Sequence, residues 1–405
     1  MSATSIPPYT TSASRGHPRD LSIDYLRTTL TLMVLGHHSS LAYTTFAYFD
    51  PQHFTRSTAP IVDNTRWLFF DYAENFNDVF FMSLMFFVSG LFVYSALKRH
   101  GTFAFIRDRF LRLGLPFAAA VTLVMPIAYY ASWQVAGKVT GQNLGFFDFY
   151  RRLAAAHFIA GPPWFVWLLL LFDVVLALVL LPFRAALPAF APFMQRLKNH
   201  PFATFAVMFI LSAALYLPLL ARYGFGAWTN LFTAPFSFQI CRIGLYSLWF
   251  VFGFLIGIPG FTNGLLATDG KLACHRRWWI ATCILAYNAL VFLPRMPVIQ
   301  HLPAAVRIPL EPILWVASCT ASCFGFLALF RGLHLTSRPW MNSLSRSAYI
   351  MYLVHYVFIT WTQRLMLGLP IHAAIKFLFV FLSTVLLSWL TAQVLLRIPK
   401  LKSIL

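Results

Sequence analysis

The sequence has few acidic residues, and few charged residues of any kind, for its length. Only 12 of its 405 residues are Asp or Glu and only 11% are charged, whereas 59% are hydrophobic. Soluble globular chains carry about 25% charged residues, so this composition excludes a soluble domain. It predicts a chain that is solvated by lipid, because apolar stretches of roughly 20 residues, enough to cross a bilayer core, recur along its length.

Cysteine is also scarce, and the patterns that would indicate a metal site are lacking. The five cysteines form no CxxC motif, and no histidine pair has zinc-ligand spacing, so we expect reduced structural thiols and no metal. Internal repeats and glycine-interrupted helix pairs are lacking too, which weakens an inverted-repeat transporter. The net charge of +19 comes from short Lys and Arg clusters between apolar stretches, which predicts membrane topology and no nucleic-acid partner.

The apolar stretches predict an all-α integral membrane protein with about ten transmembrane helices. Residues 1–18, rich in Ser, Thr and Pro, predict a disordered cytoplasmic tail before a transmembrane domain at 19–405. Placing both termini in the cytoplasm puts about twice as many positive residues inside as outside. The predicted spans are 21–43, 79–97, 113–133, 163–183, 202–222, 236–258, 278–293, 309–330, 347–366 and 374–396.

The first predicted span contains ionisable residues, which are costly at membrane depth and are therefore functional candidates. Helical periodicity places Asp24, Arg27 and His38 near one face and points His37 elsewhere. The eleven residues from Arg27 to His38 correspond to a rise of roughly 16 Å. His38 is suited to act as a general base toward a sugar hydroxyl. The alternative is a structural histidine satisfied by a neighbouring carbonyl or hydroxyl group.

A second cluster of charge precedes the third predicted span. In FIRDRFLRLGLPF, Arg109 and Arg112 lie one turn apart beside an apolar stripe, which predicts a short amphipathic helix at the cytoplasmic surface. Paired guanidinium groups suit the phosphates of a cytoplasmic donor. Anchoring to anionic lipid and positive-inside topology are the alternatives.

Other polar residues at membrane depth need partners. Glu311 is a candidate for orienting a catalytic histidine, although it could equally pair with Arg307. The first outside loop, residues 44–78, would either meet a polar ligand or cap the helix ends. The remaining intramembrane candidates are Asp173, Gln239, Arg242 and His355, and the acidic residues of the loop are Asp50, Asp63, Asp71, Glu74 and Asp78.

Seven segments in order carry a resemblance to a known family. They are RDLSIDYLRTTL, GHHSSLAY, FFVSGLFVYSALKR, FIRDRFLRLGLP, PPWFVWLLLL, SRSAYIMYLVHYVFI and LRIPKLKSIL. Together they resemble the acyltransferase family 3 membrane proteins over nearly the whole chain, and most of all the members that succinylate glucans. The resemblance implies a multi-pass enzyme of the bacterial inner membrane that moves an acyl group from cytoplasmic acyl-coenzyme A to a periplasmic glucan.

The resemblance also assigns roles to residues. It implies that His38 is catalytic and that Asp24, Arg27, Arg109 and Arg112 hold the donor. Glu311, proposed above from its position alone, is kept as the candidate catalytic partner of His38. The donor expected is succinyl-coenzyme A, with acetyl-coenzyme A as the alternative. Trp164, Arg242 and His355 are the expected substrate-binding residues.

One departure from the family pattern concerns Pro163, which stands where related glucan enzymes have a histidine. Its role is either absent here or moved to His157. This leaves the acceptor open, and an acetyltransferase for another cell-surface glycan and a glycan exporter are the alternative functions. Membrane lipid is an expected partner, and a homodimer is open.

Overall fold

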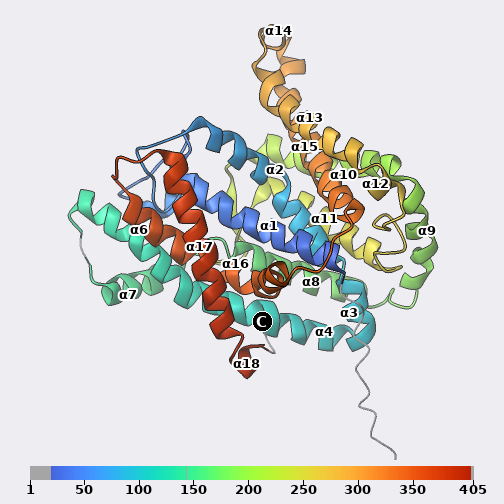
Figure 1. Ribbon diagram of the computed structural model, residues 1–405, viewed down its shortest axis with the longest axis horizontal. Coiled ribbons are helices and arrows are strands. Elements are labelled where there is room, and N and C mark those ends of the chain that lie inside the picture. The colour runs from blue at the N-terminus through green and yellow to red at the C-terminus, as the bar shows by residue number, and fades with distance from the viewer. Residues whose placement is uncertain (1–19, 143, 403–405) are drawn as a thin grey trace, which may run out of the picture.

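The computed structural model of the protein describes residues 20–142 and 144–402, most of which are helical (Figure 1). The predicted tail at residues 1–18 lies outside the described residues. Each predicted span overlaps a helix, and seven helices in the described part are long and apolar enough to cross a membrane. These are Leu68–His100, Thr102–Thr140, Pro201–Tyr223, Ile240–Gly257, Arg276–Arg295, Ala304–Gly332 and Ala373–Leu395.

Three further helices correspond to the remaining predicted spans: α1 (Leu21–Ser40), α8 (Trp164–Val179) and α16 (Pro339–Met366). Helix α8 is apolar but short, with 16 residues, whereas α1 and α16 carry more polar side chains. Strands are limited, in the described part, to one antiparallel hairpin of β1 (Trp228–Asn230) and β2 (Ser237–Gln239). The prediction of a helical, multi-pass membrane protein is therefore confirmed.

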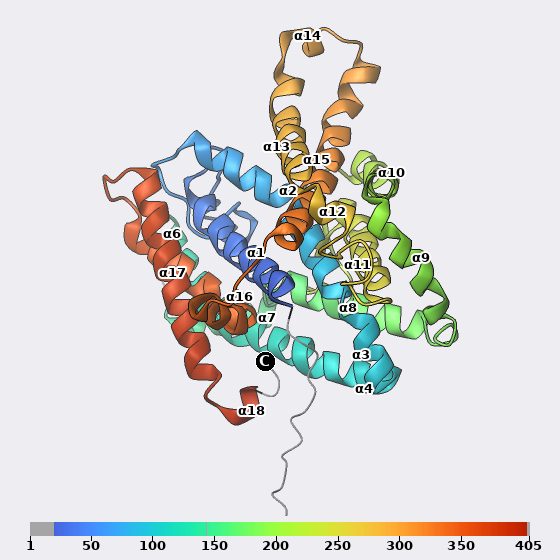
Figure 2. The same ribbon diagram turned by 45° about the vertical axis from the view of Figure 1, so that its right-hand side comes forward.

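The α-helices that make up the seven candidate spans, together with the shorter helices that connect them, are α2 (Leu68–Gly90), α3 (Val93–His100), α4 (Thr102–Arg109), α5 (Leu115–Ala119), α6 (Met125–Thr140), α7 (Phe146–Ala156), α9 (Ala191–Arg196), α10 (Pro201–Tyr223), α11 (Ile243–Gly257), α12 (Lys271–Cys274), α13 (Arg276–Phe292), α14 (Pro297–Gln300), α15 (Ala304–Gly332), α17 (Ala373–Leu395) and α18 (Pro399–Lys402). Figure 2 shows that α13, α14 and α15 form a hairpin that projects from the rest of the molecule.

Helix α1 lies in the middle of the bundle and packs against α2, α15, α16 and α17 (Figures 1 and 2). Asp20 caps its first turn, since the carboxylate accepts hydrogen bonds from the backbone N–H groups of Ser22 and Ile23. At the other end, the Gln363 amide of α16 donates to the carbonyl of His38 at 3.2 Å. Both ends of the helix that carries the candidate catalytic residues are thus fixed.

Helix α2 begins at Leu68, eleven residues before the predicted start of the second span at residue 79. The acidic residues Asp71, Glu74 and Asp78 therefore lie on a helix, and the prediction that they belong to a loop was wrong. They are tolerated there because Glu74 and Asp78 each face a basic side chain within the bundle, as described below.

Glycines let α2 and α11 approach each other at backbone distance. A Cβ atom on Gly253 would lie 2.1 Å from the carbonyl oxygen of Phe87, and one on Gly90 would lie 2.2 Å from that of Phe250. No real side chain tolerates such distances, so only glycine fits at this crossing. The close contact fixes α11, and with it Arg242 just before its first turn, against α2.

The segment before the third predicted span is not a separate interfacial helix. Helix α4 continues into a single helix, Thr102–Thr140, through a π-helical turn at Phe110–Gly114 and a second at Ala120–Val124. The expected short amphipathic helix is therefore the first two turns of the span itself. Arg109 ends α4 and Arg112 lies in the first π-helical turn, an irregularity that is frequent at functional sites.

Contacts between connections show which helix ends meet. At one end of the bundle, Arg331 Nη1 at the end of α15 lies 2.6 Å from Asp20 Oδ2 and also donates to Ser22. At the start of α17, the buried Lys376 Nζ lies 2.7 Å from Asp63 Oδ2, in the segment between α1 and α2. The Asp63 backbone N–H in turn donates to the carbonyl of Ala42, just after α1, so the two ends of α1 approach different connections.

Candidate functional site

Two cavities lie along α1, one toward each of its ends. The larger, which we name the arginine cavity, has a volume of about 560 Å³ and is bounded by α1, α2, α4, α8 and α16. Its charged lining residues are Asp24, Arg27, Arg109, Arg112, Asp173 and Arg346. The structure therefore brings together all four residues that were predicted to hold the donor.

The arginine cavity carries an excess of positive charge. Four arginines face two aspartates, Asp24 and Asp173, among its lining residues. Arg109 Nε lies 3.2 Å from Oδ2 of the buried Asp173, which fixes this guanidinium group against α8. Arg27 Nη2 lies 3.5 Å from Asp24 Oδ1 one turn earlier on α1, and the Arg27 side chain is 45% exposed. The charge and the accessible guanidinium groups suit a ligand with several phosphates.

Arg112 and Arg346 complete the cationic rim. Arg112 Nε lies 2.9 Å from Oδ1 of Asp108, which is outside the cavity lining, and both side chains are about half exposed. Arg346 is exposed at the start of α16. Tyr349, one turn further on, donates its hydroxyl hydrogen to the Arg112 carbonyl at 2.9 Å. This bond joins α16 to the π-helical turn and holds the two arginine-bearing segments together.

The smaller cavity, which we name the histidine cavity, has a volume of about 170 Å³. Its lining includes His37, His38, Asp78, Pro162, Trp164, Trp228, Gln239, Arg242 and Tyr246. His38 is partly exposed, and its Nδ1 atom is buried without a hydrogen-bond partner among the described residues. The ring of His38 packs against His355, with centroids 5.4 Å apart, and edge-on against Tyr356 at 5.3 Å.

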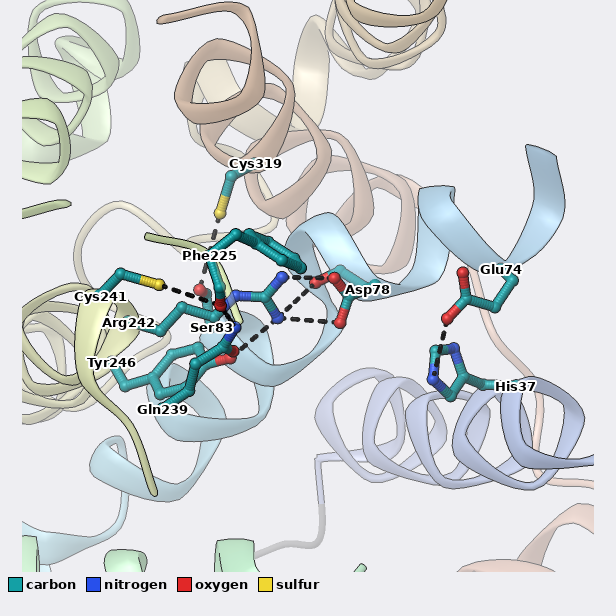
Figure 3. Close-up of polar contacts among 10 residues, drawn as sticks. All are labelled: His37, Glu74, Asp78, Ser83, Phe225, Gln239, Cys241, Arg242, Tyr246 and Cys319. Carbon is teal, nitrogen blue, oxygen red and sulfur yellow. Dashed lines mark hydrogen bonds and ion pairs between the residues drawn. The ribbon is translucent and has the colours of Figure 1, made fainter. Parts of the chain in front are cut away.

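His37 has a carboxylate partner, whereas none is found for His38 in the described part of the chain. His37 Nε2 lies 3.4 Å from Glu74 Oε1, a contact between α1 and α2 that Figure 3 shows. Both histidines line the cavity, although helical periodicity predicted that His37 would point elsewhere. Their rings are edge to face with centroids 5.1 Å apart, so the two histidines also contact each other.

Arg242 also lines the histidine cavity, and it is held by Asp78 (Figure 3). Its Nη1 atom lies 2.8 Å from Asp78 Oδ1, and its Nη2 atom donates to Oδ2 in a bidentate pair. Nη1 also contacts the hydroxyl group of Tyr246 at 3.3 Å. The guanidinium group is stacked over Phe225 and Trp315, with centroid distances of 4.7 and 5.1 Å. These contacts make Arg242 a rigid part of the wall.

Of the three residues expected to bind the substrate, Trp164 and Arg242 line the histidine cavity, whereas His355 does not. Trp164 packs edge-on against Trp228 and is stacked with Tyr246, which gives the cavity an aromatic side. His355 is fully buried and lines neither cavity; it lies directly behind His38. His355 therefore contacts the candidate base and not the cavity itself.

Two residues that the sequence analysis considered for the site, Glu311 and His157, do not lie at either cavity. Glu311 is exposed on α15 and lines neither cavity, and within the described residues it forms no ion pair with Arg307, which binds Gln300. The carboxylate that does face a histidine is Glu74. His157 is exposed after α7 and lines neither cavity, so it does not stand in for the histidine expected at Pro163, the residue just before α8.

Sequence reasoning missed the roles of Glu74, Asp78, Arg346 and Tyr352. A signal existed for the first two, because Asp71, Glu74 and Asp78 have the i, i+3, i+7 spacing of one helix face. Extending the second span backward along this spacing would have placed them inside the bundle. No such local signal marks Tyr352, which lies on α16 and lines both cavities.

The fold and the site define a multi-pass membrane protein with a polar site between its helices. Residues 20–393 match the acyltransferase domain family, acyltransferase family 3, so the chain belongs to this family and is a membrane acyltransferase. The match covers nearly the whole chain, in agreement with the resemblance seen in the sequence. Comparison with curated proteins and with solved structures gives no match.

Proposed function

We propose that this acyltransferase moves an acyl group, succinyl in the first instance, from cytoplasmic acyl-coenzyme A to hydroxyl groups of a periplasmic glucan. The observation that carries the proposal is the placement of Arg27 and His38 on α1. The two residues open into different cavities and are separated by eleven residues, or roughly 16 Å of helix. A donor held by its phosphates at one cavity would present its acyl group toward the other.

The arginine cavity supports a coenzyme A donor through its charge. Coenzyme A carries phosphates, and guanidinium groups bind phosphate with two parallel hydrogen bonds. Arg109 is fixed by Asp173, and Arg112 lies in a π-helical turn tied to Tyr349, so these groups are positioned before a ligand arrives. Binding to such a preorganised site loses less side-chain entropy.

The histidine cavity supports transfer to a hydroxyl group. In the proposed step, His38 accepts the proton of an acceptor hydroxyl group while the oxygen of that hydroxyl group attacks the thioester carbonyl carbon. The carbon–sulfur bond then breaks, and the protonated His38 returns the proton to the coenzyme A thiolate. His355 and Tyr356 pack on the His38 ring and fix its orientation, which is the role we assign to them.

Size and composition of the histidine cavity favour a short acyl group and a sugar. A volume of about 170 Å³ is small for a long lipid chain but sufficient for a succinyl or acetyl group. Trp164 and Trp228 offer aromatic faces, and Gln239 and Tyr246 offer polar groups, a mixture typical of small-molecule sites. Succinyl and glucan rest on the sequence resemblance, and acetyl transfer to another surface glycan remains the second candidate.

For the topology we propose ten crossings with both termini in the cytoplasm of a bacterium, in its inner membrane. The arginine cavity would then face the cytoplasm, where coenzyme A is made. The contacts of Arg331 with Asp20 and of Lys198 with Asp269 join connections that this topology places on one side. The Lys376–Asp63 pair joins two connections that it places on the other.

The test is mass spectrometry of periplasmic glucans from a deletion strain beside its parent, with the strain complemented by the parent gene or by His38→Ala. We expect the loss of one succinyl mass per modified site in the deletion and His38→Ala strains, and its return with the parent gene. An acetyl mass difference on another glycan would select the second candidate. Unmodified glucan retained inside the deletion strain would instead indicate an exporter.

A further inference from the structure

Tyr352 occupies the boundary between the two cavities. It is the one residue, in the part of the chain that the structure describes, that lines both the arginine cavity and the histidine cavity. Tyr352 is 4% exposed, so protein atoms surround it almost completely at this boundary. The direct line from one cavity to the other along α1 therefore meets Tyr352.

The side chain of Tyr352 is held across this boundary by contacts on both sides. Its hydroxyl group donates a hydrogen bond to the carbonyl oxygen of Pro162, which belongs to the histidine cavity. Its ring packs edge-on against Phe165 of the arginine cavity, with centroids 6.0 Å apart. A single hydrogen bond at the tip of an otherwise apolar ring is a contact that can break and re-form without disturbing the helix.

Tyr352 is also coupled to both sites through α16. One turn before it, Tyr349 is bonded to the Arg112 carbonyl, and one turn after it, Tyr356 packs on His38. The backbone carbonyl of Tyr352 lies 2.6 Å from Nδ1 of His355, the residue that stacks on His38. A row of three tyrosines thus runs along one face of α16 from the arginine cavity to the candidate base.

We propose that Tyr352 is a gate that separates the two cavities, with its hydrogen bond to Pro162 as the latch. With the latch closed, water and acceptor in the histidine cavity are kept from the donor side. Opening would admit the acyl end of the donor to His38, and the width of the opening would limit the acyl group in size. The separation of the two cavities by Tyr352 rests on geometry, and only the role of this gate in acyl transfer rests on the proposed function.

The separation of the two cavities by Tyr352 is tested by thiol labelling with a membrane-impermeant methanethiosulfonate reagent. The labelling is done in sealed membrane vesicles of both orientations. The exposed Cys274 is first replaced by Ser, because the other four cysteines are buried. Ser89→Cys then reports the side that opens to the arginine cavity, and Val34→Cys reports entry into the histidine cavity. Neither residue belongs to the proposed binding or catalytic groups.

We expect Val34→Cys to react slowly from the side that labels Ser89→Cys, and much faster once Tyr352→Ala is added. Tyr352→Phe keeps the ring but removes the latch, so it should raise the labelling rate by about fivefold, the effect of one neutral hydrogen bond. Leu169→Ala is the control, since Leu169 lines only the arginine cavity, and it should leave the rate unchanged. Equal rates with and without Tyr352, or an equal increase in Leu169→Ala, would overturn the gate.

A second measurement concerns acyl transfer. In Tyr352→Ala, water should reach the thioester, so that its oxygen attacks the carbonyl carbon and releases free acid and coenzyme A thiol without acceptor. We expect acceptor-independent hydrolysis of succinyl-coenzyme A to rise relative to transfer. Unchanged hydrolysis beside faster labelling would overturn the role in transfer. A parent protein that turns over no acyl-coenzyme A would instead refute the proposed function and leave the labelling result standing.

Discussion

His37 Nε2 and Glu74 Oε1 lie 3.4 Å apart, and this contact distinguishes two adjacent histidines that line the same cavity. The carboxylate ties His37 to α2. His38 has no such partner among the described residues; its ring packs against His355 and Tyr356, and the residue lines the cavity. His37 therefore has the setting of a positioned wall residue, and His38 that of a free base.

Replacing His38 with Ala should abolish acyl transfer, since general-base catalysis contributes roughly 10²–10⁴-fold to rate. His37→Ala should have a milder effect because it removes a wall contact and leaves the base in place. The measurement is acylated product formed by purified, monodisperse variants, with Glu74→Gln as a companion to His37→Ala. Equal activity of His38→Ala and the parent would refute the proposed mechanism.

Arg109 and Arg112 are predicted to bind the donor by geometry as well as by charge. Loss of one hydrogen bond to a charged group costs roughly 1.5–3 kcal/mol, so Ala at either position should weaken donor binding by about ten- to a hundredfold. Lys should recover little of this affinity, because it offers a point charge and no planar fork. His38→Ala should leave donor binding nearly intact. The measurement is calorimetric binding of coenzyme A in detergent at fixed ionic strength.

A matched control for the arginine prediction lies on the same helix. Arg107 is exposed on α4 and does not line the cavity, so Arg107→Ala removes equal charge without removing a proposed ligand. Arg109→Ala also leaves Asp173 buried and unpaired, and it is therefore compared in an Asp173→Asn background. Unchanged affinity in the Arg109→Ala, Arg112→Ala double variant would mean that these residues only anchor the helix.

The Lys376–Asp63 ion pair, which lies away from the arginine cavity, should contribute strongly to the free energy of unfolding. Both side chains are almost completely buried, so Lys376→Met should cost about 3–5 kcal/mol by leaving a buried carboxylate unpaired. Adding Asp63→Asn should restore much of the loss. Thermal unfolding in detergent measures the effect, with Asp148→Asn of the exposed Arg151–Asp148 pair as control. Additive losses in the double variant would contradict this account.

Gly253→Ala should destabilise the contact between α2 and α11, because its Cβ would meet the Phe87 carbonyl oxygen at 2.1 Å. Overpacking typically costs about 1–3 kcal/mol, and a clash with backbone leaves no side chain to move. Gly226→Ala, where a Cβ would meet nothing within 4 Å, is the control. A melting temperature that falls equally in both variants would show that the crossing is not the cause.

Sequence by itself determined much of α1 and of the membrane class. Long apolar stretches can only be buried in lipid or in a bundle, which is why each predicted span overlaps a helix and why seven helices in the described residues are long and apolar enough to cross a membrane. Helical periodicity is a local property, so the shared course of Asp24, Arg27 and His38 along α1 could be predicted without tertiary contacts. Arg109 and Arg112 were found for the same reason, although their helix continues into the span.

Tertiary structure decided which residues from distant segments meet. Glu74 faces His37 and Glu311 does not, because α2 packs directly on α1, whereas Glu311 lies on the exposed part of α15. The acidic residues of α2 resembled a loop because a lone carboxylate is costly in lipid, and only the fold supplies their basic partners. Tyr352 lies more than three hundred residues from His38, so the shared wall of the two cavities arises only when α16 packs against α1.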